Sequence, residues 1–176
     1  MCKGIPGRLA IVKRLLTAGT SLPAILEADP SKLLEFIKLE FSSLNEIDDS
    51  QRLILASIAF SKQPLSISDL SALLSEPESK IQSTILASQF LTINSSTSAV
   101  EFFSISHLKF AEKQLEKFRK EALSAQIQHL LKDPKGGNSL RFLPSYYETL
   151  SQHEAVLSLL SKEHYSDLLD STQSFT

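Results

Sequence analysis

The 176-residue sequence contains a single cysteine, Cys2, and this scarcity excludes two kinds of structure. One cysteine cannot form an internal disulfide, and it cannot support a cysteine-based zinc site. The four histidines are far apart, without the His-x-x-x-His spacing that places two ligands on one helix face. We therefore expect no metal site, and a reducing compartment, the cytoplasm, suits such a chain.

Long apolar runs and an excess of one charge are also missing. The longest apolar stretches are far shorter than the roughly 20 residues of a membrane-spanning helix. The N-terminus has no apolar segment that could serve as a secretory signal. With 18 basic and 20 acidic residues, the net charge is −2, which gives no general attraction to nucleic acid or to an anionic membrane.

The sequence also has no recognisable catalytic constellation. Gly136-Gly137 is not followed by Lys-Ser/Thr, so it predicts a turn and not a phosphate-binding P-loop. No serine has the context of a nucleophile elbow, and Cys2 has no obvious base beside it. We expect that this chain, on its own, is not an enzyme.

Apolar residues at helical spacing dominate what is present, and 42% of the residues are hydrophobic, enough for a real core. A first helix is expected from Ile5-Pro6 to near Gly19, because proline suits the first turn and glycine suits the stop. A short helix over 22–27 follows. Asp29-Pro30 then predicts the start of a third helix with a wide apolar face up to Leu44.

The middle of the chain has the element order of a winged helix. We expect a buried helix over 51–60, an extended stretch at 64–67, a brief helix over 70–74 and another over 78–87. Two short strands, at 90–93 and 100–103, flank a polar tip, Asn94 to Ser98, and predict a β-hairpin. A long amphipathic helix is then expected from about His107 to Leu131.

The remainder predicts helical hairpins, like the first units of a helical-repeat array, although no internal period is evident. Asp133 to Asn138 should form a turn, followed by helices over 144–149 and 153–160 and a last one after 161–164. The fold class is therefore mainly α, in three parts: a small helical domain (1–46), a winged helix with a small β-hairpin (47–118) and a helical tail (119–176). Both ends are abrupt, as expected of a piece cut from a longer chain.

A winged helix suggests DNA binding, but the charges argue against it. The third helix, 78–87, carries one lysine, Lys80, and no arginine, and the wing tip has no basic residue. Phosphates and bases are usually contacted by cationic side chains. The basic residues between Lys109 and Lys120 alternate with glutamates, which is typical of a solvated helix face.

Gly4-Ile5-Pro6, followed by Gly7-Arg8-Leu9, resembles the Gly-x-Pro segment of the STAND ATPases, the NACHT and NB-ARC class. In that family the motif opens a helix in the small helical domain after the ATPase core, and its proline packs on the adenine. A winged helix follows, with a histidine after its last strand that contacts the β-phosphate of ADP. Here Ser106-His107-Leu108 keeps the histidine of the Met-His-Asp motif but neither neighbour.

The resemblance implies that Pro6 and His107 converge on one side of the fold as nucleotide contacts. The Walker A lysine and Walker B acids are absent from the chain, so ATP and ADP would belong to the parent protein, and the chain alone needs no cofactor. The implied partners are the ATPase core and sensor repeats of that parent, with homo-oligomerisation on activation. The implied role is regulation in bacterial antiphage defence or signalling.

Blander interpretations remain open beside this one. Pro6 is also what an ordinary helix start would use, and His107 could simply hold a strand-to-helix junction with a local hydrogen bond. The chain could instead be a stand-alone winged-helix protein that binds nucleic acid. It could equally be an adaptor whose helical tail offers a groove to a partner helix.

Overall fold

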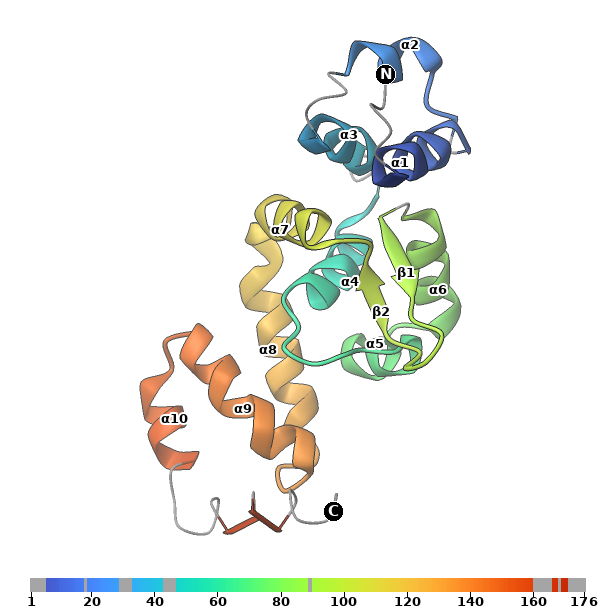
Figure 1. Ribbon diagram of the computed structural model, residues 1–176. Coiled ribbons are helices and arrows are strands. Elements are labelled where there is room, and N and C mark those ends of the chain that lie inside the picture. Colours follow the sequence, from blue (N-terminus) through green and yellow to red (C-terminus); the bar gives the residue numbers. More distant parts are fainter. Residues whose placement is uncertain are drawn as a thin grey trace.

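The computed structural model describes residues 6–17, 19–28, 33–42, 47–88, 90–159, 166–167 and 169–170. Helices dominate these residues, and the two strands among them form an antiparallel hairpin (Figure 1). The predicted fold class, mainly α with a small β-hairpin, is confirmed. No helix in this described part is both long and apolar enough to span a membrane.

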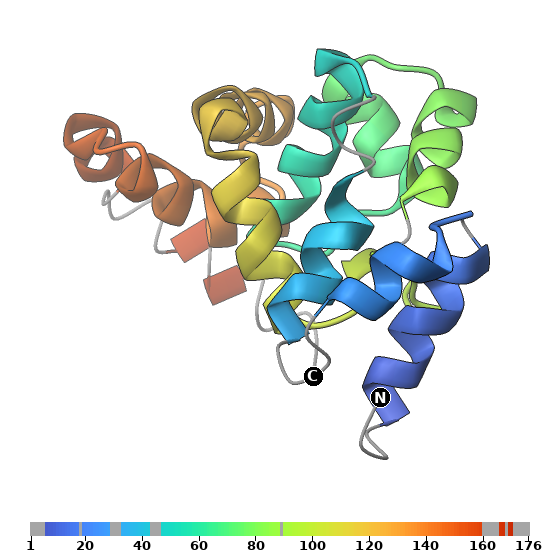
Figure 2. The ribbon, with the colours of Figure 1, turned by 90° about the horizontal axis from the view of Figure 1, so that it is seen from above.

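Three short helices form a unit at one end of the molecule (Figures 1 and 2). They are α1 (Pro6–Thr17), α2 (Leu22–Glu27) and α3 (Leu33–Glu40). The first starts at Pro6, as expected for a residue without an N–H to satisfy. Ser21 caps α2 by accepting a hydrogen bond from the Ala24 N–H. Gly4, Ile5 and the predicted Asp29-Pro30 cap lie outside the described residues.

The next five elements occur in winged-helix order. They are α4 (Asp49–Ala59), α5 (Ile67–Leu74), α6 (Glu78–Ala87), β1 (Leu91–Ile93) and β2 (Val100–Phe102). In the hairpin, Thr92 faces Glu101 across the two strands. The stretch before α5 joins the sheet through one bond, from the Val100 N–H to the Leu65 carbonyl, at 2.8 Å. The end of α4 is wholly buried, as its apolar sequence predicted.

The brief second helix of this unit begins earlier than predicted. The predicted helix started at residue 70, whereas the N-cap is Ser66, because Ser66 and Asp69 form a reciprocal capping box. The Asp69 carboxylate accepts from the Ser66 N–H at 2.8 Å, and the Ser66 hydroxyl accepts from the Asp69 N–H at 3.1 Å. Asp69 is therefore the third residue of α5 and not its cap.

The single long helix predicted over 107–131 is wrong. The structure has α7 (Ile105–Gln114), a 3-10 turn η2 (Glu116–Phe118) and α8 (Arg119–Leu130) in its place. Neither proline nor glycine causes the break. Leu115 and Phe118 are both buried at the bend. Both helices pack against α4, but α7 also packs against α3, whereas α8 also packs against α5 and α9. A straight helix could not bury both residues and reach all of these partners, so packing overrides helical propensity here.

The tail forms two further helices, α9 (Gly137–Thr149) and α10 (His153–Leu159). The prediction that α9 starts at Pro144 is wrong, because the proline lies inside the helix. Pro144 cannot donate to the Leu140 carbonyl, which normally costs stability. The burial of Leu140 and Leu143 against the core offsets that loss. The last predicted helix, after 161–164, lies largely outside the described residues.

Two apolar clusters hold these helices together. A small one lies between α1, α2 and α3 and is built from Ile11, Leu15, Ile25 and Phe36. A large one extends from α3 through the winged helix to α8 and α9, across residues 118 and 119. Helix α3 contributes to both clusters. The division into three domains stays a prediction.

Candidate functional site

His107 lies in the first turn of α7, directly after β2, at the boundary between the α1–α3 unit and the winged helix. Ser104 caps this turn, and its hydroxyl lies 2.8 Å from Nδ1 of His107. The histidine is only 3% exposed. The serine cap fixes the start of α7, and the His107 ring in this first turn points into the protein, towards α3.

Glu40, the last residue of α3, meets the histidine. Its side chain is fully buried, and its Oε2 lies 2.8 Å from Nε2 of His107. The other oxygen, Oε1, accepts from Nε of Arg14 on α1, also at 2.8 Å. One carboxylate thus joins three helices, α1, α3 and α7. We call Arg14, Glu40, Ser104 and His107 the junction network.

The acceptor character of Glu40 fixes the hydrogen on one nitrogen of the histidine ring. An ionised carboxylate only accepts, so Nε2 of His107 must carry a hydrogen. In the neutral ring, Nδ1 then accepts from the Ser104 hydroxyl; in the charged ring, Nδ1 donates to it. Both ring nitrogens are engaged in either state. His107 therefore has no nitrogen left for a phosphate in this conformation.

Aromatic contacts close the junction network on its solvent side. The Arg14 guanidinium lies 4.2 Å from the centroid of the Phe103 ring, close enough for a cation–π contact. The same ring meets the His107 ring edge-on, with centroids 6.4 Å apart. A buried charge is tolerated only when it is paired and hydrogen-bonded, and the bonds from Arg14 and His107 meet that condition for Glu40.

The structure locates the two predicted nucleotide contacts only in part. Pro6 begins α1, but its side chain lies outside the description. Arg14 lies eight residues further along the same helix, about 12 Å at the usual rise per residue. The predicted convergence of Pro6 and His107 stays a prediction. What the sequence did not suggest is that His107 has a carboxylate partner.

A second buried polar network links the tail to the winged helix. The Tyr146 hydroxyl, on α9, donates to Oε1 of Gln126, on α8, and accepts from the Lys62 N–H at 2.8 Å. Nε2 of Gln126 donates to the Ser57 carbonyl of α4 at 2.9 Å. Both Tyr146 and Gln126 are fully buried. Burial raises the pKa of Tyr146, against the opposing effects of its bonds with Ser61 and Lys62.

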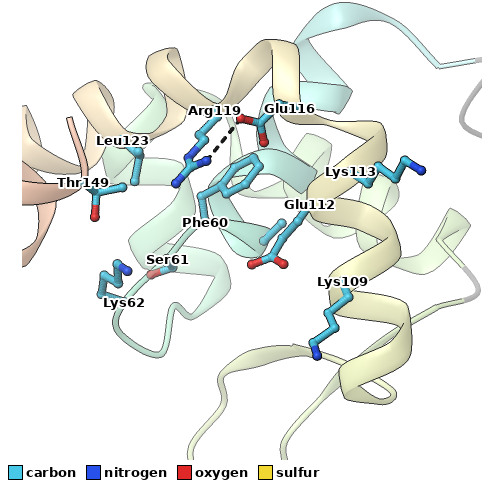
Figure 3. Close-up of a pocket in the computed structure, with 11 residues that line it drawn as sticks. Phe60, Ser61, Lys62, Lys109, Glu112, Lys113, Glu116, Arg119, Leu123 and Thr149 are labelled. Atoms are coloured by element: carbon cyan, nitrogen blue, oxygen red, sulfur yellow. Dashed lines mark hydrogen bonds and ion pairs between the residues drawn. The ribbon is translucent and has the colours of Figure 1, made fainter. Parts of the chain in front are cut away.

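A pocket of about 410 Å³ opens beside Phe60, between the end of α4 and helices α7 and α8 (Figure 3). Charges of both signs surround it: Lys62, Lys109, Glu112, Lys113, Glu116 and Arg119. Arg119 donates to Glu116 at 3.2 Å, so part of this charge is already neutralised. In Figure 3, Lys113 points away from the other side chains drawn. The mixture does not define a site for one kind of ligand.

The helix that would read DNA, α6, has little to offer a phosphate. Its only lysine, Lys80, donates to Oε1 of Glu76 at 2.9 Å and to the Ser50 hydroxyl at 2.8 Å. These contacts hold the amino group against the start of the helix and towards α4. The sequence-based argument against nucleic acid thus gains a structural reason, while the binding itself stays untested.

The same cluster predicts a pH effect on stability. The hydrogen bond from Ser50 and the contact with Lys80 lower the pKa of Glu76 from its usual value of 4.5. A carboxyl whose folded-state pKa is lowered stabilises the fold above its unfolded pKa, and this contribution is lost as the pH falls through the folded value. In chemical denaturation below pH 4.5, the free energy of unfolding should therefore fall less steeply with decreasing pH for Glu76→Gln than for the wild type. Parallel pH profiles for the two proteins would contradict this.

The described part of the chain contains no group of three or more His, Cys, Asp or Glu residues placed to hold a metal ion. Comparisons with protein-family models, with curated proteins and with solved structures find no match for this chain. The junction network and the pockets are thus interpreted from their own geometry.

Proposed function

We propose that the chain is a non-catalytic regulatory segment of a STAND-type ATPase, and that the junction network transmits the state of a nucleotide. In this proposal the ATPase core and the sensor repeats belong to the rest of the parent protein, in a cytoplasmic setting. The observation that carries the proposal is the buried contact between Glu40 and His107, which spans the helical unit and the winged helix.

The position of His107 supports this assignment. The resemblance expects a histidine directly after the last strand of the winged helix, and His107 lies in the first turn after β2. Ser104 satisfies one ring nitrogen of this buried histidine locally, but the other is paired outside the strand-to-helix junction. Its contact with Glu40, 67 residues away in sequence, makes it a link between two units.

The same geometry suggests how such a link would switch. The N–H at Nε2 of His107 donates to one acceptor at a time, and both a carboxylate and a phosphate are acceptors of that N–H. We therefore propose two exclusive partners, Glu40 and the phosphate of a nucleotide. Exchange between them would change how tightly the α1–α3 unit is held to the winged helix, which is a bistable contact that ligand binding can bias.

The coding sequence that precedes residue 1 provides the first test. It should encode a P-loop, Gly-x-x-x-x-Gly-Lys followed by Ser or Thr, because the proposal requires an ATPase core there. A preceding region without any P-loop contradicts the proposal.

In the chain that includes this core, His107→Ala should weaken ADP binding about 10- to 100-fold, the value of a hydrogen bond to a charged group. Equilibrium dialysis with labelled ADP measures it. Glu40→Gln should bind ADP at least as well as the wild type, because a neutral amide oxygen is a weaker acceptor than the carboxylate and competes less for the Nε2 N–H of His107. His153→Ala, an exposed histidine on α10, is the matched control. Equal losses in His107→Ala and Glu40→Gln would indicate a purely structural histidine and refute the switch.

A further inference from the structure

A groove of about 690 Å³ lies between α3 and α7. Its floor is aromatic, because the rings of Phe41 and Phe110 meet edge-on with centroids 4.9 Å apart. Leu34 on α3 stands beside them and is 51% exposed, a large apolar side chain left in contact with water. The apolar surface that the groove leaves open is therefore supplied by Leu34 and the half-buried Phe110, whereas Phe41 is buried, at 4% exposed.

The rim of this groove carries charge of one sign. Lys38 projects from α3, and Lys109 and Lys113 project from α7, one helical turn apart. None of the three forms a salt bridge within the described ranges, and no described residue lining the groove is acidic. This uniform sign contrasts with the net charge of −2 of the whole chain. The two lysines of α7 also line the mixed pocket beside Phe60, and Glu112 and Glu116 line that pocket but not the groove.

We propose that the groove binds an amphipathic protein helix whose apolar face is flanked by carboxylates. Leu34 and Phe110 would take the apolar face, and the three lysines would pair with the flanking acids. The lining residues recur at helical spacing along both α3 and α7, so the two helices present parallel rows of side chains to an occupant, as in helix-in-groove recognition. A flat anionic membrane is a poorer match, because it would contact the lysines but leave the recessed floor uncovered.

A helix in this groove would touch both sides of the junction network. α3 ends with Glu40 and α7 begins beside His107, and the groove lies between the same two helices. An occupant would therefore hold the helical unit against the winged helix and stabilise the Glu40–His107 contact. This inference does not depend on the presence of an ATPase core.

The test uses a fluorescent synthetic helix of about 15 residues, with leucines at i, i+3, i+4 and i+7 and glutamates beside them. We expect saturable binding in fluorescence anisotropy, weakened about tenfold or more by Lys109→Glu/Lys113→Glu through charge repulsion. The matched control is Lys62→Glu/Lys120→Glu, which makes the same change in charge on exposed lysines outside the groove. That control should bind like the wild type.

A second pair of variants tests the apolar floor. Leu34→Ser should also weaken binding, whereas Leu86→Ser, at an exposed leucine on α6, should not. All these residues are exposed, so thermal unfolding should confirm that each variant remains folded. Absence of saturable binding, or equal weakening in the two lysine pairs, overturns the proposal. If anionic vesicles displace the peptide, and this displacement requires Lys109 and Lys113, the face binds a lipid surface. That result also overturns the proposal.

Discussion

Glu40→Ala should destabilise the protein by about 3–5 kcal/mol, the usual cost of removing one partner of a buried ion pair. The Glu40 side chain is fully buried and accepts from both Arg14 and His107. Without it, the N–H at Nε2 of His107 would stay in the interior with no acceptor. Arg14 loses less, because its side chain is 23% exposed and it keeps its contact with the Phe103 ring.

Urea denaturation followed by circular dichroism measures this loss. Glu121→Ala, which removes an exposed carboxylate from α8, is the control and should stay within about 0.5 kcal/mol of the wild type. A double-mutant cycle with His107→Ala isolates the pair, and the two losses should be strongly non-additive because both remove one interaction. Additive losses would show that Glu40 and His107 are not coupled, and would remove the basis of the proposed switch.

Tyr146→Phe should cost about 1–3 kcal/mol, because it leaves the partly buried Lys62 N–H without its acceptor and removes a donor to the buried Gln126. The ring itself is retained, so apolar packing is nearly unchanged. Thermal unfolding should show a lower Tm for this variant. Tyr147→Phe, at the neighbouring and less buried tyrosine, should show little change. Equal Tm values for the two variants would mean that the hydroxyl of Tyr146 is not structural.

The same substitution should alter the alkaline limit of stability. Burial raises the pKa of Tyr146 above its usual value of 10.0, because the interior disfavours the phenolate. A group whose folded-state pKa is raised contributes stability below its unfolded pKa, and this is lost as the pH rises through the folded value. The difference in free energy of unfolding between the wild type and Tyr146→Phe should therefore shrink above pH 10.0, as measured by chemical denaturation across that range. A constant difference would contradict this assignment.

Local chemistry made the winged helix predictable. The Asp48 cap, the polar tip of the hairpin and the buried α4 each have signals within a few residues of one another. The break at Leu115 has no such signal, since it depends on the further partners of the two helices, α3 for α7 and α5 and α9 for α8. At Pro144 a local signal was present but did not decide the structure. Proline favours the start of a helix, yet α9 begins earlier because it buries Leu140 and Leu143.

Of the two central residues of the candidate site, only His107 could be proposed from the sequence. His107 was singled out by the family resemblance, which expects a histidine after the last strand, but nothing near it in sequence indicates Glu40. One signal did exist in α3, where Glu40 follows Phe36 by four residues and thus falls on the buried face of the helix. A charge on a buried face requires a partner, so a basic or polar residue is expected opposite this face of α3. The identity of that partner required the fold.

Helix α3, shared by the two apolar clusters, also makes the stability of one depend on the other. Among the described residues, the small cluster has four buried side chains, few to set against the conformational entropy of three helices and their loops. Its Phe36 is adjacent to Ile37, which belongs to the large cluster. The position of α3 is therefore fixed from both sides, and a change that displaces α3 also removes packing from α1 and α2.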